Sequence, residues 1–344
     1  MKSSENELHE LPKCGLETIQ ASTLEPLNEN QKEKLDQIIS IVSKHLSYTD
    51  EGRVTLTFRG VNRDHLTSKL SSKVTSLSDE KLFSLLFYFG DKAKQYYISE
   101  DTKASGLRWL QKIEDFSQET YSTIFEKIRY VLKSEKREVR TFCKQNKEFA
   151  DFFLNDNNRS IFISSLIEET NFGRDYYLYF LHTAGEIGIR NNKSIFVSTS
   201  LSFDLAVKFS GNSGEGYVIY YIIPEPFENF AISYKRVQSY EPWLTAQSLP
   251  IYNGEALYPE QYEVAIKGAL FSSFILGVRV IEKNRFIVNP YLFQEPNAIE
   301  SILIGLYIDQ TDFIKRLGET GYRRGVGIYL EGTYRTILRE SAVL

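Results

Sequence analysis

This chain contains few of the residues that build covalent or metal-centred scaffolds. Its 344 residues include only two cysteines, Cys14 and Cys143, and four histidines. Two cysteines cannot form a disulfide framework, so we expect reduced thiols. Neither cysteine nor any histidine has a second ligand at the spacing of a zinc motif, and we expect no bound metal.

The common nucleotide-binding and hydrolase motifs are absent as well. The sequence contains no P-loop GxxxxGK[ST], no GxGxxG after a strand and no GxSxG elbow. The chain therefore lacks the defining residues of a P-loop NTPase, of a Rossmann enzyme and of a serine hydrolase with a nucleophile elbow.

An excess of charge of one sign and a long apolar run are also lacking. The net charge is −4, from 41 basic and 45 acidic residues, which disfavours binding to nucleic acid by bulk charge but leaves a local basic groove open. The longest apolar stretches, Gly216–Pro224 and Gly268–Ile281, are shorter than the roughly 20 residues of a membrane span. The N-terminus has no apolar secretory signal. We expect a cytoplasmic protein with no membrane partner.

Aromatic residues are plentiful, and the apolar pattern predicts an α+β fold with a mainly helical N-terminal half. Aromatics make up 14% of the chain, enough for a large core. We expect a mobile polar arm over residues 1–30 and a mainly helical region over 31–175. The latter begins with a helix over 31–46, holds a strand over 53–58 and contains a helical insertion over 79–170. Residues 176–344 form the β-rich part.

The β-rich part is expected to hold most of the strands, one short helix and one long loop. The loop spans residues 234–259, the helix spans 202–210, and a final helix is expected over 310–317. The predicted strands are residues 176–181, 194–197, 216–223, 261–267, 271–281 and 285–288.

A run rich in lysine and arginine, residues 133–147, ends the longest helical segment of the first half. A solvated helix face is the simpler explanation of such a run, and a phosphate-binding surface is the alternative.

Three short segments carry residues that suit chemistry. The first is Thr57-Phe58-Arg59-Gly60 and the second is Ser198-Thr199-Ser200 before a helix; the third is Tyr258-Pro259-Glu260-Gln261-Tyr262-Glu263 before a strand. Each segment alone has a plain structural explanation: a turn with a surface arginine, a helix cap, or two side chains on one strand face. Their order and strand contexts make the three together more informative.

In these three segments the chain resembles the mono-ADP-ribosyltransferases of the Arg–Ser–Glu class, in the variant with Gln-x-Glu. The resemblance covers about residues 53–290. It implies two packed β-sheets around a cleft for NAD, the substrate, and a catalytic core within residues 176–344. It also implies a toxin: one of a toxin–antitoxin or phage-defence system, with a neutralising antitoxin as partner, or a delivered effector.

The resemblance assigns a role to each motif residue. Glu263 would stabilise the cation-like ribose, Ser198 would hold Glu263, and Gln261 would orient the acceptor. Arg59 would clamp the NAD pyrophosphate. The remaining NAD-binding residues would be Gly60, Thr199 and Ser200, and Tyr258 and Tyr262 would recognise the acceptor.

The first motif residue has a rival. Arg59 precedes Ser198 by 139 residues, so either the helical block is inserted between two core strands or Arg59 is the wrong residue. His182, at the end of a predicted strand 16 residues before Ser198, is the alternative, because a related transferase class uses histidine there to contact NAD. Arg59 is the preferred assignment. Phe209, the nearest aromatic that could stack on nicotinamide, is better explained as a core residue.

The neutral amide of Gln261 suits an amide or a base edge better than a guanidinium. We therefore expect a macromolecular acceptor other than arginine, either single-stranded nucleic acid or protein. Two competing interpretations are a catalytically inactive transferase-like binding module and an unrelated α+β interaction protein.

Overall fold

The computed structural model describes residues 4–46, 54–70, 76–91, 118–167, 171–188, 196–211, 215–224, 227, 231–253, 262–267, 270 and 274–294. The chain divides into two compact units. Unit 1 takes its described residues from 1–103, 197–231 and 266–344, and unit 2 takes them from 104–196 and 232–265. These boundaries differ from the expected division at residue 175, because each unit combines segments that are distant in the sequence.

The described strands form one sheet of nine strands in the order β2-β1-β9-β8-β5-β3-β4-β7-β6. The α+β class is confirmed, whereas the two packed sheets expected from the resemblance are not found in the described residues. Alternation shows which face of a strand is apolar but not which edge it joins. The strands are β1 Gly15–Gln20, β2 Thr23–Pro26, β3 Val54–Asn62, β4 Phe196–Ser200, β5 Gly216–Pro224, β6 Ala231–Ser233, β7 Glu263–Lys267, β8 Ile275–Val280 and β9 Arg285–Val288.

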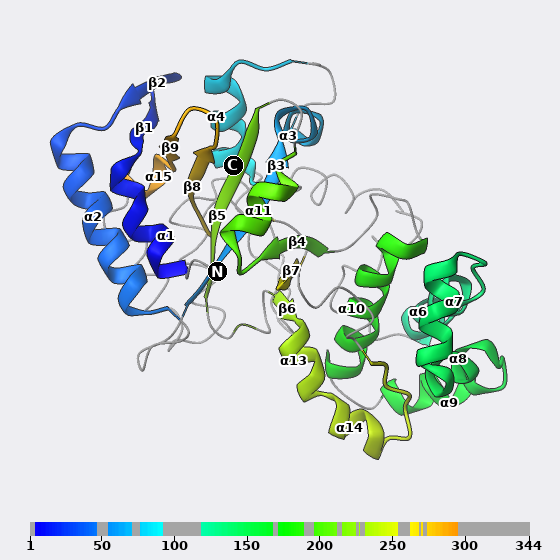
Figure 1. The fold of residues 1–344 in the computed structure, drawn as a ribbon. Helices are drawn as coiled ribbons and strands as arrows, with labels where there is room; N and C mark the ends of the chain where they lie inside the picture. Colours follow the sequence, from blue (N-terminus) through cyan, green and yellow to red (C-terminus); the bar gives the residue numbers. More distant parts are fainter. Residues whose placement is uncertain are drawn as a thin grey trace, which may run out of the picture. The chain divides into compact units, whose positions relative to one another are not determined.

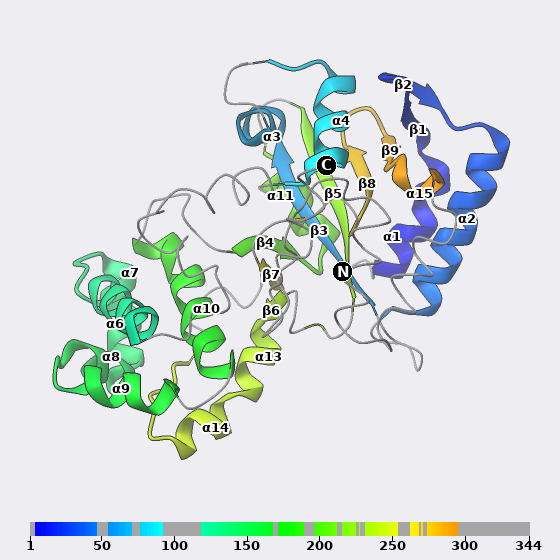
Figure 2. The same ribbon diagram turned by 180° about the vertical axis from the view of Figure 1, so that it is seen from behind.

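The centre of the sheet in unit 1 is the antiparallel pair β3 and β5, which match over nine residues from Val54 opposite Pro224 to Asn62 opposite Gly216. In β5 every residue from Tyr217 to Ile223 is buried. A continuous apolar run of this kind is typical of a strand covered on both faces. The helix α11, Phe203–Phe209, packs against β3 and β5 (Figure 2).

Residues 4–30 contain a helix and two strands, so the predicted mobile arm is wrong over this range. Ser4–Glu10 form α1, and β1 pairs in parallel with β9 from Gly15 opposite Arg285 to Thr18 opposite Val288. Leu8 and Leu11 are buried, and Thr18 donates a hydrogen bond of 3.0 Å to the carbonyl of Val288. The few apolar residues here are enough to place this segment at the edge of a sheet, although its composition is polar.

Among the remaining helices of unit 1, α2, Glu29–Lys44, which lies beside α1 (Figure 1), and α4, Asp79–Phe89, match predicted helical segments, whereas no helix is predicted at the other two. The predicted helix over 31–46 is confirmed as α2, Glu29–Lys44, where Asn28 and Gln31 form a capping box. The others are α3 Arg63–Leu70, α4 Asp79–Phe89 and the short α15 Tyr291–Gln294.

Unit 2 contains a group of helices (Figure 1) built around an aromatic core. The five helices described over residues 118–188 lie in the sequence between β3 and β4, which pair at Phe58 and Ser200, and the predicted helical insertion stays a prediction. The helices are α6 Gln118–Leu132, α7 Arg137–Gln145, α8 Lys147–Leu154, α9 Asn158–Ile167, α10 Asn171–Gly188, α13 Tyr234–Ser239 and α14 Glu241–Ala246.

Two predictions for unit 2 are wrong. The strand predicted over 176–181 is the middle of α10, and the long loop predicted over 234–259 contains α13 and α14. All six residues from Tyr176 to Leu181 are buried. A helix that is covered on every side shows no 3.6-residue period, so its aromatic residues resemble a strand. The helix predicted over 310–317 lies outside the described residues.

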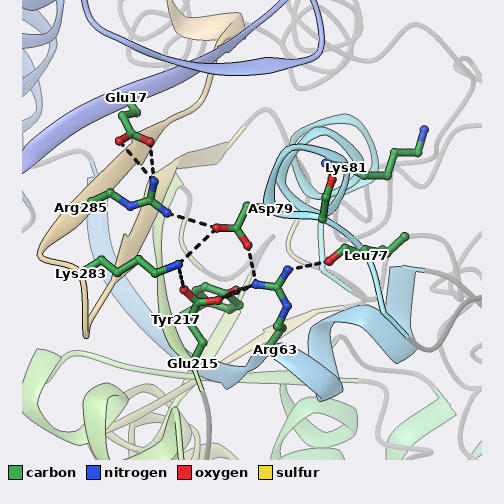
Figure 3. Close-up of polar contacts among 10 residues, drawn as sticks. Glu17, Arg63, Leu77, Asp79, Lys81, Glu215, Tyr217, Lys283 and Arg285 are labelled. Carbon is green, nitrogen blue, oxygen red and sulfur yellow. Dashed lines mark hydrogen bonds and ion pairs between the residues drawn. The ribbon is translucent and has the colours of Figure 1, made fainter.

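A network of charged side chains joins the ends of several elements in unit 1 (Figure 3). Arg63, directly after β3, pairs with Asp79 at the start of α4 and with Glu215, at 2.5 Å. Lys283 bonds to Glu215 at 2.6 Å, and Arg285 links Glu17 at 3.0 Å to Asp79 at 3.2 Å. Three carboxylates thus face three cations.

Glu215 shows the electrostatic effect of this network. Although burial works in the opposite direction, the hydrogen bond from Lys283, assisted by Tyr217 and Arg63, lowers the pKa of the Glu215 carboxyl. The network fixes the start of β5 to its neighbours, and its internal charge balance argues for a structural role.

None of the helices in the described part of the chain combines the length and hydropathy that a membrane span requires.

Candidate functional site

Arg59 lies inside β3, which continues through Gly60 to Asn62 instead of ending at the arginine. Its Nε donates to the carboxylate of Asp91, a fully buried residue just after α4. Its Nη1 donates to the carbonyl oxygen of Ser198 at 2.7 Å. Two residues 139 positions apart in the sequence are therefore neighbours across the pair β3 and β4.

Not all N–H groups of the Arg59 guanidinium are hydrogen-bonded to described residues. A guanidinium carries five N–H groups, and the contacts with Asp91 and Ser198 use two of them. No other hydrogen-bond partner of this side chain exists among the described residues. The Arg59 side chain is only 12% exposed, so a phosphate group that reached it would meet a cation already oriented by Asp91.

Gly60 has a packing explanation. A Cβ atom at this position would lie 1.7 Å from the carbonyl oxygen of Ala206 in α11. Only glycine allows α11 to approach β3 this closely. The contact explains why glycine follows Arg59 without any contact to a ligand, and the predicted role of Gly60 in NAD binding stays a prediction.

The three hydroxyls of Ser198-Thr199-Ser200 lie within β4 and differ in their surroundings. Thr199 and Ser200 are buried, and the Ser200 hydroxyl accepts a hydrogen bond of 3.0 Å from the backbone of Ser202, the residue that caps α11. Ser198 is partly exposed, on the opposite face of the strand from Thr199. Ser200 thus shapes the turn into α11. The hydrogen bond expected from Ser198 to Glu263 stays a prediction.

His182 and Glu263, both in unit 2, form a direct pair. His182 lies on α10 and not at a strand end, and Glu263 is the first residue of β7. The His182 Nε2 and Glu263 Oε1 atoms are 2.9 Å apart, and the two side chains are 8% and 14% exposed. With a proton on Nε2, the imidazole donates this hydrogen bond to the carboxylate.

Two aromatic side chains lie near this pair. The ring of His182 packs edge-on against Phe196, with 5.4 Å between ring centroids. Burial raises the pKa of Tyr179, one helical turn before His182, and the negative charge of Glu263 adds to this effect. Glu263 is therefore mostly shielded from solvent and acts electrostatically on Tyr179. The pair was not predicted from the sequence, because His182 was expected on a strand.

The chain turns sharply just before Glu263. Tyr262 has a φ of 46°, in the left-handed region that non-glycine residues rarely adopt. Its side chain is 47% exposed, as expected of a residue that contacts an acceptor. Strain of this kind costs about 1–3 kcal/mol and is concentrated at functional sites. Tyr258 and Gln261 lie outside the described residues.

Phe209, at the end of α11, is 55% exposed, so the interpretation as a core residue is wrong. It lies in unit 1, as do Arg59 and Ser198. Among the described residues, no three side chains of histidine, cysteine, aspartate or glutamate gather as a metal-binding group.

Comparison with known proteins adds no family: no family model, no curated protein and no solved structure matches this chain.

Proposed function

We propose that this chain is a mono-ADP-ribosyltransferase that cleaves NAD and transfers ADP-ribose to a macromolecular acceptor other than arginine. The observation that supports it best is the hydrogen bond of 2.7 Å from Arg59 to the carbonyl of Ser198. This contact makes neighbours of two motif residues that the helical block separates in the sequence. Such a contact is expected if the helical block is inserted between two core strands, which is the alternative that keeps Arg59 as the motif residue.

Glu263 carries the chemistry in this proposal. The bond between ribose C1′ and nicotinamide breaks, nicotinamide leaves with the electron pair, and positive charge develops on the sugar. A fixed carboxylate near the ribose hydroxyls stabilises the charge on the sugar more than it stabilises the ground state, in which the positive charge lies on the nicotinamide ring. The acceptor then attacks C1′ and loses its proton.

His182 and Arg59 take different roles. The imidazole of His182, 2.9 Å from Glu263, holds the carboxylate in one orientation, so we assign it as a positioning residue. The unused N–H groups of Arg59 fit the NAD pyrophosphate, and Arg59 remains our choice for the first motif residue. Thr199 and Ser200 are proposed to shape the NAD-binding strand.

The acceptor and the biological setting follow from the resemblance. Gln261, with Tyr258 and Tyr262, would recognise an amide or a base edge. A cytoplasmic toxin, paired with an antitoxin or active in phage defence, fits this chemistry, and a delivered effector is the other possibility. If the chain released no nicotinamide from NAD, the inactive binding module and the unrelated interaction protein would be the remaining explanations.

The test is incubation of the purified chain with NAD labelled in its adenylate part and a cell lysate, followed by protease or nuclease digestion. Label that survives protease but not nuclease identifies a nucleic-acid acceptor, and the reverse identifies a protein. Transfer by the wild type and none by Glu263→Gln is the expected result. Absence of label from the wild type in every lysate would refute the proposal.

A further inference from the structure

The helix α7 presents a face of basic side chains. Successive residues of a helix turn by about 100°, so Arg137, Arg140 and Lys144 lie within about 60° of one another around the axis. All three are exposed, whereas Val139 and Phe142 on the other side of the helix are buried. The apolar side anchors α7 in unit 2, so the three cations face solvent.

These cations lack counterions within the described part of the chain: Arg137, Arg140 and Lys144 have no ion pair there. Several other basic residues of unit 2 form ion pairs there, among them Arg129 with Asp156, Arg159 with Glu126 and Lys147 with Asp151. The positive charge of these three side chains is therefore not neutralised by the described residues and is available to a negatively charged ligand.

Positive charge is also concentrated at the start of α7. Lys136 is the residue before the helix, without a side-chain capping bond, and Arg137 is its first residue. The helix macrodipole favours acidic residues at this end and disfavours cations. The stability of the helix does not explain these two residues.

Further basic residues lie next to α7 in the sequence. Residues 133–147 contain six basic and two acidic residues, in a chain whose net charge is −4. Lys133 is exposed, and Tyr130, one turn before it on α6, is 69% exposed. The thiol of Cys143 lies 3.8 Å from the carbonyl of Leu132, so α7 adjoins the end of α6.

We propose that this surface binds the phosphate backbone of a single-stranded nucleic acid. We call it the basic face, and its residues are Lys133, Lys136, Arg137, Arg140 and Lys144, with Tyr130 beside them. The seven steps of the helix from Arg137 to Lys144 rise about 10 Å, the length of about three phosphates of a stacked strand. Arginine donates two parallel hydrogen bonds to phosphate, and an exposed tyrosine can stack on an unpaired base.

Nucleic acid is favoured over an acidic protein segment by this combination of cations and an exposed aromatic side chain. If the proposed function holds, the basic face makes nucleic acid the acceptor of the ADP-ribose. That last step rests on the proposed function, whereas the binding itself does not.

The test is fluorescence anisotropy of the full chain with a short labelled single-stranded RNA, and with DNA of the same sequence, over a range of salt concentrations. We expect the variant R137E/R140E/K144E to bind at least about tenfold more weakly. The slope of log K against log salt should fall by about 2, at about 0.7 for each phosphate that is no longer neutralised. The control variant K32E/K81E/K235E removes the same charge from α2, α4 and α13 and should bind as the wild type does.

Three results would overturn the proposal: no binding by the wild type, equally weakened binding by both variants, or tighter binding to polyglutamate through the same residues, which would indicate an acidic protein partner. Nicotinamide release from NAD without acceptor separates this proposal from the transferase. We expect the R137E/R140E/K144E variant to release nicotinamide at the same rate as the wild type. Binding without any release by the wild type would refute only the transferase, and release without binding would refute only the basic face.

Discussion

The pair of His182 and Glu263 gives the sharpest prediction, because both partners lie in unit 2 and are mostly buried. We consider two changes that keep the shape of each side chain. His182→Phe retains a ring against Phe196, and Glu263→Met retains the length of the glutamate while removing its charge. Each change removes the bond of 2.9 Å between Nε2 and Oε1.

A hydrogen bond to a charged group contributes about 1.5–3 kcal/mol. Because the two side chains are 8% and 14% exposed, solvent screens this bond only weakly. We therefore expect a coupling free energy of about 2 kcal/mol between the two substitutions. The double variant should be less destabilised than the sum of the single variants by this amount.

The assay is urea unfolding of the four proteins, followed by tryptophan fluorescence, to which Trp243 of the same unit contributes. A coupling within about 0.5 kcal/mol of zero, the additivity expected of independent sites, would refute the pair. The same four proteins test the positioning role. If His182 acts only through Glu263, His182→Phe should lower kcat in the wild-type background and change nothing further in Glu263→Met.

Three further predictions follow from unit 1. Gly60→Ala should lower stability in urea by about 1–3 kcal/mol or more, because its Cβ would meet the carbonyl of Ala206 at 1.7 Å; an unchanged midpoint would contradict the packing explanation. Arg59→Ala should destabilise by about 3–5 kcal/mol because it breaks a buried ion pair with Asp91, whereas Arg59→Lys should fold and raise the KM for NAD several-fold. The lowered pKa of Glu215 means that folding favours its ionised form, so its contribution to stability is present above the ordinary value of 4.5 and is lost as the pH falls further. Thermal melts at a series of acidic pH values should show a shallower loss in Glu215→Gln, and identical slopes would disprove this contribution.

The parts of the fold that the sequence predicted are those with a clear period. The helix α2 has buried residues at helical spacing, and the strands β5 and β9 are short apolar runs bounded by turn residues. Local patterns are sufficient there, because one face of each helix, or the whole of each strand, meets the core.

The errors occurred where tertiary contacts override the local pattern. The middle of α10, including Tyr176, is covered on every side and so loses its period. The strand β1 is recognised only through its pairing with β9, 270 residues away at Thr18 and Val288. No local pattern contains such a partner.

The candidate site was predicted in part. The resemblance implied successive core strands for Arg59 and Ser198, with His182 as the alternative to Arg59. The contact between His182 and Glu263 depends on a turn of α10 meeting the first residue of β7, which sequence spacing does not encode. Asp91, the buried partner of Arg59, also has no signal in the sequence, because a single aspartate after a helix is common at turns.

The most direct test of the transferase proposal is nicotinamide release from NAD by the purified wild-type chain and by Glu263→Gln, with circular dichroism to confirm that both are folded. Glutamine keeps the volume of the side chain and its contact with His182 but removes the charge that stabilises the ribose cation. We predict release by the wild type and a loss of at least about 100-fold in kcat for Glu263→Gln, with little change in KM. Equal release by both proteins, or none by the wild type, would contradict the assignment of Glu263 as the catalytic carboxylate.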